Sequence, residues 1–173
     1  MPIFPLSKKV DSYKTNASAK FGAPRSNGTR KHAGVDLGIG AGSAVYSIAK
    51  GTVLEATNSG FFVIEDKKVN IGVVTVKHDV KIKIGETEYD SFVVRYGEID
   101  TVKVSVNATV SEGDQLCSVA KQADEGTELH LELYLGEQGI TSSSVFKSDK
   151  KPYMRAFTPS DPATLLDSLN IKP

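Results

Sequence analysis

The chain has 173 residues, enough for one domain with a real core and few for two. Lysines plus arginines and aspartates plus glutamates each number 21, so the formal net charge is zero, which argues against a general electrostatic attraction to nucleic acid or to an acidic membrane. The single cysteine excludes an internal disulfide.

The N-terminal segment, Met1 to Lys9, contains no apolar run long enough for a signal peptide or a membrane span. We therefore expect no membrane insertion. The next segment, residues 11–30, is polar and rich in glycine, serine, lysine and asparagine, which predicts an ordered loop. This loop leads to His32-Ala33-Gly34-Val35-Asp36, in which an imidazole and a carboxylate four residues apart share a glycine-bearing stretch.

From Val45 onward, short segments rich in β-branched and aromatic residues alternate with glycine, asparagine and aspartate, a rhythm typical of an antiparallel β domain. The segments expected to be strands are residues 44–49, 51–57, 60–66, 71–80, 89–99, 101–106 and 114–120. His78 ends one of them, and we interpret it as a structural residue rather than a metal ligand. Near the C-terminus, Ser160-Asp161-Pro162 predicts the start of a short helix through Leu169 that closes one edge of the sheet.

Residues Glu128 to Tyr134 alternate polar and apolar side chains without a break, which predicts a strand with two different faces. The face expected to enter the core carries Leu129, Leu131 and Leu133. The opposite face carries Glu128, His130, Glu132 and Tyr134. A histidine between carboxylates on a sheet face is unusual, and the alternative interpretation is a solvated face with an inert histidine.

A second site makes a metal centre the better interpretation of that histidine. Imidazole nitrogens and carboxylate oxygens are the usual non-thiolate ligands of zinc, and a catalytic zinc typically takes three protein ligands and leaves one position for water. His32, Asp36 and His130 supply such a set, with two ligands close in sequence and the third on a distant strand. The sequence therefore predicts a Zn2+ site formed by these three residues.

The pattern His32-x-x-x-Asp36 within HAGVDLGIGAGSAVYSIAKGTV, followed much later by ELHLELY, resembles the lysostaphin-type (LytM-like) zinc metallopeptidases. Members of this family cut peptide bonds in bacterial peptidoglycan. The resemblance runs from about Phe21 to Leu166 and includes VVRYGEI and VSEGDQLCSVA. It implies an all-β fold, with an antiparallel sheet in a barrel-sandwich hybrid of the lysostaphin-peptidase type and a short C-terminal helix. We expect one domain over residues 1–173, loop-rich at 1–30, with a core at 31–166 that carries the metal site.

The sequence departs from the family's pattern at two positions where members usually carry catalytic histidines. The first histidine of the family's His-x-His is Glu128 here, and the histidine that usually follows Tyr-Gly is Glu98. A carboxylate near a zinc-activated water accepts its proton and passes it to the leaving amine. Both glutamates are candidates for this catalytic role. We favour Glu98, because in the family the residue at the end of the Tyr-Gly turn points into the cleft. Glu128 would instead orient the ligands or contact substrate.

Further residues are expected around the same site. Glu132 would hold a ligand imidazole in one tautomer. For all three glutamates, a solvent-facing strand charge is the alternative. Arg25 and Arg30 are expected at the substrate cleft, because family members often place an arginine or asparagine from this region there; a solvated loop charge is the alternative. Tyr134 is expected to contact substrate, with packing as its alternative, and residues 141–153 are expected to form a cleft wall or lid.

The sequence thus predicts a zinc metalloendopeptidase that hydrolyses peptide cross-links or stem peptides of peptidoglycan. The alternative is a catalytically silent zinc-binding domain that recognises cell-wall peptide or a protein partner. The pairing of RYGEI with LHLELY resembles peptidase domains attached to injection machines. We therefore expect an antibacterial effector or phage lysin, delivered to the periplasm or cell wall without an ordinary secretory signal. Its expected partners are peptidoglycan peptides and a cognate inhibitor (immunity) protein, and not nucleic acid.

Overall fold

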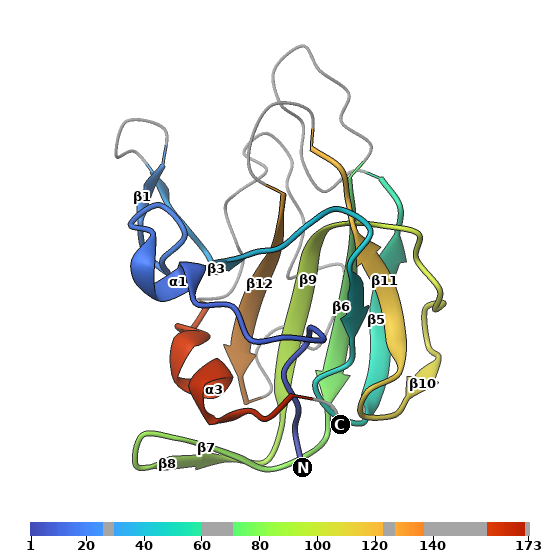
Figure 1. Cartoon of the computed structure of the whole chain (residues 1–173). Coiled ribbons are helices and arrows are strands. Elements are labelled where there is room, and N and C mark those ends of the chain that lie inside the picture. The colour runs from blue at the N-terminus through green and yellow to red at the C-terminus, as the bar shows by residue number, and fades with distance from the viewer. Residues whose placement is uncertain (26–29, 60–70, 123–126, 137–158, 172–173) are drawn as a thin grey trace.

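The computed structural model describes residues 1–25, 30–59, 71–122, 127–136 and 159–171. An eight-stranded antiparallel sheet forms the centre of the molecule (Figure 1). Its strands are β3 (Val35–Gly38), β4 (Ala44–Tyr46), β5 (Gly51–Thr57), β6 (Gly72–His78), β9 (Phe92–Asp100), β10 (Thr109–Val110), β11 (Gln115–Val119) and β12 (Glu128–Leu135). The other described elements are the hairpins β1 (Pro24–Arg25) with β2 (Arg30–Lys31) and β7 (Ile82–Ile84) with β8 (Thr87–Tyr89), and the helices α1 (Ser12–Thr15) and α3 (Ala163–Ser168).

Strand β9 organises the sheet, because it pairs with three other strands. From Phe92 to Gly97 it lies between β6 and β12, and at Ile99 and Asp100 it pairs with β11. The change of partner falls at Glu98, which has a φ angle of 62°. Residues other than glycine rarely adopt this left-handed backbone conformation. The backbone therefore turns out of the regular ladder at Glu98.

The core forms where the apolar faces of these strands meet. Leu129, Leu131 and Leu133 of β12 are fully buried, as the alternating pattern predicts. Val94 and Tyr96 of β9 join the same core cluster. The N-terminal segment contributes Phe4 and Leu6, and α3 contributes Leu165 and Leu166. The N-terminal segment and α3 therefore pack into the apolar core of the sheet.

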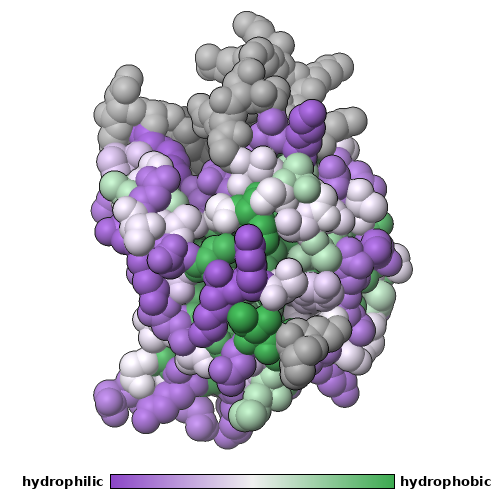
Figure 2. Space-filling model, in the orientation of Figure 1, coloured by the Kyte–Doolittle hydropathy of each residue, from purple (hydrophilic) through white to green (hydrophobic). Residues whose placement is uncertain are grey.

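The described residues expose few large apolar side chains. On the face shown in Figure 2, hydrophilic residues predominate and hydrophobic residues gather near the centre. Among the described residues, the exposed large hydrophobic side chains are those of Met1, Val106 and Ile171. Within the same part of the chain, neither helix has the length and apolar character needed to cross a membrane.

The prediction of an antiparallel all-β fold with a short C-terminal helix is confirmed. The expected strand 51–57 coincides with β5, and strands β6, β9, β11 and β12 lie within or beside their expected segments. The expected segment 44–49 shortens to β4. The segment 60–66 and the expected lid at 141–153 lie outside the described residues.

The expectation of a strand at residues 101–106 is wrong. Thr101 and Asn107 have positive φ angles of 50° and 68°, so the backbone turns sharply at both ends of the segment. Between them, Val102 and Val104 pack partly buried side chains against the core. An extended segment that places alternate valines on the core gives the same period-two pattern as a strand, without the strand's ladder.

The ends of the chain also differ in detail from expectation. The segment 11–30, expected to be a loop, contains α1 and β1. The C-terminal helix begins at Ala163, one residue after the proline expected in its first turn, with Pro162 in the N-cap position. Asp161 still accepts a hydrogen bond from the Ala163 amide at 2.9 Å, so it satisfies one free amide of the first turn, as expected for an aspartate at this place.

Candidate metal centre

The three predicted ligands come from segments that the sheet brings together. His130 on β12 lies directly opposite Asp36 on β3, because the two strands pair in antiparallel register. His32 directly follows β2. The chain between His32 and Asp36 passes so close to β12 that a Cβ at Gly34 would lie 2.2 Å from the Leu131 carbonyl oxygen. Glycine at position 34 therefore allows the approach that joins the two ligand segments.

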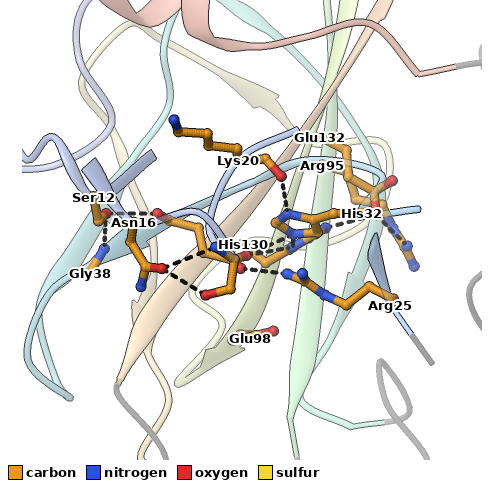
Figure 3. A network of polar contacts seen from close by, with 12 residues as sticks. Ser12, Asn16, Lys20, Arg25, His32, Gly38, Arg95, Glu98, His130 and Glu132 are labelled. Carbon is orange, nitrogen blue, oxygen red and sulfur yellow. Dashed lines mark hydrogen bonds and ion pairs between the residues drawn. The ribbon is translucent and has the colours of Figure 1, made fainter. Parts of the chain in front are cut away.

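The donor atoms of the three side chains form a compact triangle. His32 Nε2 lies 3.0 Å from Asp36 Oδ1 and 3.1 Å from His130 Nδ1, and His130 Nδ1 lies 3.0 Å from Asp36 Oδ1. All three residues are buried. In Figure 3, the two imidazoles lie against each other beside Arg25.

Both imidazoles are fixed by acceptors on their outer side. His32 Nδ1 lies 2.8 Å from the Lys20 carbonyl oxygen, and His130 Nε2 lies 3.0 Å from Glu132 Oε1. When both rings are neutral, as metal ligation requires, hydrogens on these outer nitrogens leave the other ring nitrogens, as lone pairs, directed toward Asp36. Three acceptor atoms that face one another require a positive charge between them.

This donor set fits zinc. In a tetrahedral site with bonds of about 2.0–2.1 Å, neighbouring donors lie about 3.4 Å apart, close to the separations seen here. Burial lowers the pKa of His130, but the carboxylates of Asp36 and Glu132 outweigh it and raise the pKa to about 10. The surroundings of this ring therefore favour a cation, as a proton or as a metal. His32, Asp36 and His130 would hold zinc, as the sequence predicts.

The second oxygen of Asp36 faces Arg25. The guanidinium Nη2 of Arg25 donates to Asp36 Oδ2 at 3.1 Å. Burial would raise the pKa of Asp36, but hydrogen bonds from His130 and His32 lower it to about 2, so the group is a carboxylate at neutral pH. Arg25 thus lies at the site, with a side chain that is 28% exposed. The side chain of Arg30 lies outside the described residues.

The two glutamates that the sequence suggests as proton acceptors, Glu98 and Glu128, also reach the site. Carboxylate oxygens of Asp36, Glu98 and Glu128 lie within 4.8 Å of one another. Glu98 is buried and accepts a hydrogen bond from Gln122 Nε2. Burial and the nearby carboxylate of Asp36 raise the pKa of Glu98 to about 7 and that of Glu128 to about 8. Neither glutamate is therefore an ordinary solvent-facing strand charge.

Glu132 and Tyr134 lie deeper in the sheet than the metal ligands. Both are fully buried. Glu132 Oε1 accepts the hydrogen of His130 Nε2, and Tyr134 donates its hydroxyl to Glu132 Oε2 at 2.5 Å. The expected contact between Tyr134 and substrate is therefore corrected: its hydroxyl is used inside the protein, and the packing interpretation holds. Glu132 lies where a carboxylate would fix the tautomer of His130.

Two residues that form hydrogen bonds in this site, Lys20 and Gln122, could not be identified from the sequence. Lys20 contributes its backbone carbonyl, so its side-chain type says nothing of the role. Gln122 lies in the segment between β11 and β12 and approaches Glu98 only through tertiary folding. The third histidine, His78, is buried at the end of β6, with Nδ1 at 3.2 Å from the Lys50 carbonyl oxygen. It lies outside the metal group, where the structural interpretation placed it.

Comparisons with known proteins indicate a family and a fold. The family model of peptidase family M23 matches residues 30–142. A peptidase M23 from Pseudomonas aeruginosa is similar in structure at 19% identity and a TM-score of 0.52, over 98% of this chain and 54% of that one. The catalytic domain of the antimicrobial peptidase lysostaphin from Staphylococcus simulans is similar at 16% identity and a TM-score of 0.51, over 97% and 90%.

A zinc-containing peptidase from Vibrio cholerae is also similar, at 18% identity and a TM-score of 0.51, over 78% of this chain and 37% of that one. The chain therefore spans about half of the Pseudomonas structure and a smaller part of the Vibrio one. At these identities, the likeness shows the fold. A search of curated proteins finds no match to the sequence.

Proposed function

Since the chain belongs to peptidase family M23, we propose that it is a zinc metalloendopeptidase that hydrolyses peptide cross-links or stem peptides of bacterial peptidoglycan. The observation that carries this proposal is the convergence of His32, Asp36 and His130, whose donor atoms lie 3.0–3.1 Å apart and face one another. The similarity to a zinc-containing peptidase and to the antimicrobial peptidase lysostaphin supports zinc and a peptide substrate.

The three ligands would hold the metal, and the remaining residues would handle substrate and protons. Zinc bound there supplies a Lewis acid, which polarises the scissile carbonyl and lowers the pKa of the attacking water. The outer hydrogen bonds of His32 and His130, to Lys20 and Glu132, hold the rings in the orientation that ligation needs.

Glu98 is the better placed of the two glutamates to act as the general base. It is buried and held by Gln122, whereas Glu128 is only half-buried at the start of β12. A fixed carboxylate in a dry site accepts the proton of the attacking water and returns it to the leaving amine. Glu128 lies close enough to contact the substrate beside Glu98.

Arg25 offers the site a positive charge. One of its nitrogens binds Asp36, and the partly exposed guanidinium has further donors for a carbonyl or carboxylate of the substrate. Arg25 would thus bind substrate at the cleft, and it also holds the outer oxygen of Asp36.

A digest of purified peptidoglycan sacculi tests the proposal. The zinc-loaded protein should release fragments that mass spectrometry identifies as products of peptide-bond cleavage, and a chelator should abolish them. His130→Ala serves as the matched inactive control. Bound zinc without new fragments from several wall types would instead favour the silent zinc-binding domain, in which Glu98 and Glu128 recognise peptide without cutting it.

The place of action is part of the same proposal. A peptidoglycan hydrolase acts in the periplasm or at the cell wall. We therefore propose that the protein is a delivered effector or a phage lysin. If it is an effector, an inhibitor protein would protect the cell that produces it. Expression directed to the periplasm of a Gram-negative host should lyse the cells, while cytoplasmic expression and the His130→Ala variant should not. Equal growth of all three cultures would contradict this location.

A further inference from the structure

A row of polar side chains crosses the sheet next to the metal ligands. Glu132 of β12 lies opposite Arg95 of β9, Arg95 opposite Thr75 of β6, and Thr75 opposite Glu55 of β5. Directly paired residues project to the same face of a sheet. His130 precedes Glu132 by two positions, so it projects to this face as well. The row therefore begins directly beside a metal ligand.

The row holds charges that are removed from solvent. Glu132 is fully buried and Arg95 is 6% exposed. Arg95 Nη1 lies 3.6 Å from Glu132 Oε1, and Arg95 Nε lies 3.7 Å from Glu55 Oε2. A buried carboxylate without a compensating charge is strongly unfavourable. Among the ion pairs of the described residues, Arg95 is the permanently charged partner of Glu132, whereas the nearer partner, His130 at 3.0 Å, is charged only when protonated.

Glu132 connects this charge pair to the metal site. Its Oε1 atom lies 3.0 Å from His130 Nε2 and accepts the ring hydrogen there. Its Oε2 atom accepts the hydroxyl hydrogen of Tyr134, which fixes the plane of the carboxylate. With the hydrogen held on Nε2, the Nδ1 lone pair of His130 points toward Asp36 and His32.

We propose that Arg95 is a positioning residue of the metal centre. Its charge compensates the buried charge of Glu132, Glu132 holds the Nε2 hydrogen of His130, and His130 thereby presents Nδ1 to the metal. Arg95 touches neither metal nor substrate and acts through Glu132 alone. The inference rests on His130 as a metal ligand, as the proposed function does, but it does not require that the site cut a peptide.

Zinc affinity, measured by competition with a chromophoric chelator near neutral pH, tests this role. Arg95→Met removes the charge and keeps most of the side-chain volume, so it should weaken zinc binding by about 10–100-fold, the usual effect of losing an outer partner of a ligand. Arg95→Lys keeps the charge and should retain more of the affinity. Glu55→Gln removes a second carboxylate that lies near Arg95 among the described residues and leaves Glu132 paired, so this variant should bind zinc as the wild type does.

A double variant separates positioning from a general loss of structure. Glu132→Gln introduces a neutral amide oxygen that accepts the His130 hydrogen and needs no cation. If Arg95 acts through Glu132, adding Arg95→Met to Glu132→Gln should leave zinc affinity unchanged. A further loss of about tenfold or more in the double variant would overturn the proposal. Wild-type affinity in folded Arg95→Met would overturn it as well.

If Arg95→Met fails to fold, the proposal can still be overturned by a further loss of about tenfold or more in the double variant relative to Glu132→Gln. Circular dichroism in chelator establishes which variants are folded. Peptide cleavage plays no part in these measurements. A wild-type protein that binds zinc but cuts no sacculus would therefore end the proposed function and leave the inference about Arg95 untouched.

Discussion

His32 Nε2 and His130 Nδ1 lie 3.1 Å apart, although the two residues are 98 positions apart in the chain. Only the folded sheet brings them together, through the pairing of β3 with β12. The metal site is therefore a property of the native state. A metal that binds this state and not the unfolded chain stabilises the fold by mass action.

Zinc should accordingly raise the thermal unfolding midpoint of the wild-type protein, and a chelator should remove the increase. His32→Ala, Asp36→Ala and His130→Ala should each lose stoichiometric zinc, measured by elemental analysis after dialysis, and should show no zinc-dependent rise of the midpoint. His78→Asn is the matched control, because His78 is the histidine outside the metal group. Full zinc content in the His130→Ala protein would remove this residue from the ligand set.

Glu98→Gln should keep zinc while lowering the rate of peptide hydrolysis by about a hundredfold or more, because the amide no longer accepts the proton of the attacking water. Glu128→Gln should have a smaller effect on the rate, since Glu128 is only half-buried and less firmly placed. Glu86→Gln, in the exposed turn between β7 and β8, is the matched carboxylate control. The opposite order of the two active-site variants would assign the base to Glu128.

Local sequence patterns were sufficient to predict the part of the site that lies on one strand. The alternation through Glu128 to Tyr134 places His130 and Glu132 on one face, because side-chain direction in a strand depends only on position parity. That Tyr134 is buried did not follow, since the alternation does not say how deep its end of the strand lies. The burial and the bond to Glu132 are tertiary facts.

Contacts between residues on different strands could not be predicted from the sequence, for a different reason. The opposition of Arg95 and Glu132 depends on the register of β9 against β12, which no spacing within either segment reveals. The left-handed backbone of Glu98 is equally hidden, because glutamate is not a residue that favours this conformation. The resemblance to a family predicted that Glu98 points into the cleft, whereas its sequence context alone predicted only a strand.

That backbone conformation gives a test of strain at the proposed base. At a φ angle of 62°, glycine is relaxed and any residue with a Cβ is strained. Glu98→Gly should therefore be more stable than Glu98→Ala by about 1 kcal/mol in urea unfolding with chelator present. At Lys77, within β6 and without a positive φ, the order should reverse, because glycine weakens an ordinary strand. Greater stability of the alanine variant at position 98 would contradict the strained geometry.

His78 provides a pH dependence that is separate from the metal site. Its ring is fully buried, packs at 4.8 Å between ring centroids against Phe92, and has Nδ1 at 3.2 Å from the Lys50 carbonyl oxygen. Burial lowers the pKa of His78 to about 4, although the Lys50 and Ala49 carbonyls and Asp79 act in the opposite direction. The folded protein therefore keeps the ring neutral while the unfolded chain takes up a proton below its ordinary pKa of about 6.5.

Because the pKa is lower in the folded state, the contribution of His78 to stability is complete above about pH 6.5 and is lost as the pH falls toward 4. Between about pH 7 and pH 5 the loss should be about 2 kcal/mol in the free energy of unfolding. The decisive quantity is the difference in the free energy of unfolding between wild type and His78→Asn, both in chelator, because contributions that the two proteins share cancel in this difference. His78→Asn keeps a donor for the Lys50 carbonyl and cannot titrate, so its stability should fall less steeply with pH. Parallel curves for the two proteins would show that His78 is protonated as readily in the folded state as in the unfolded one.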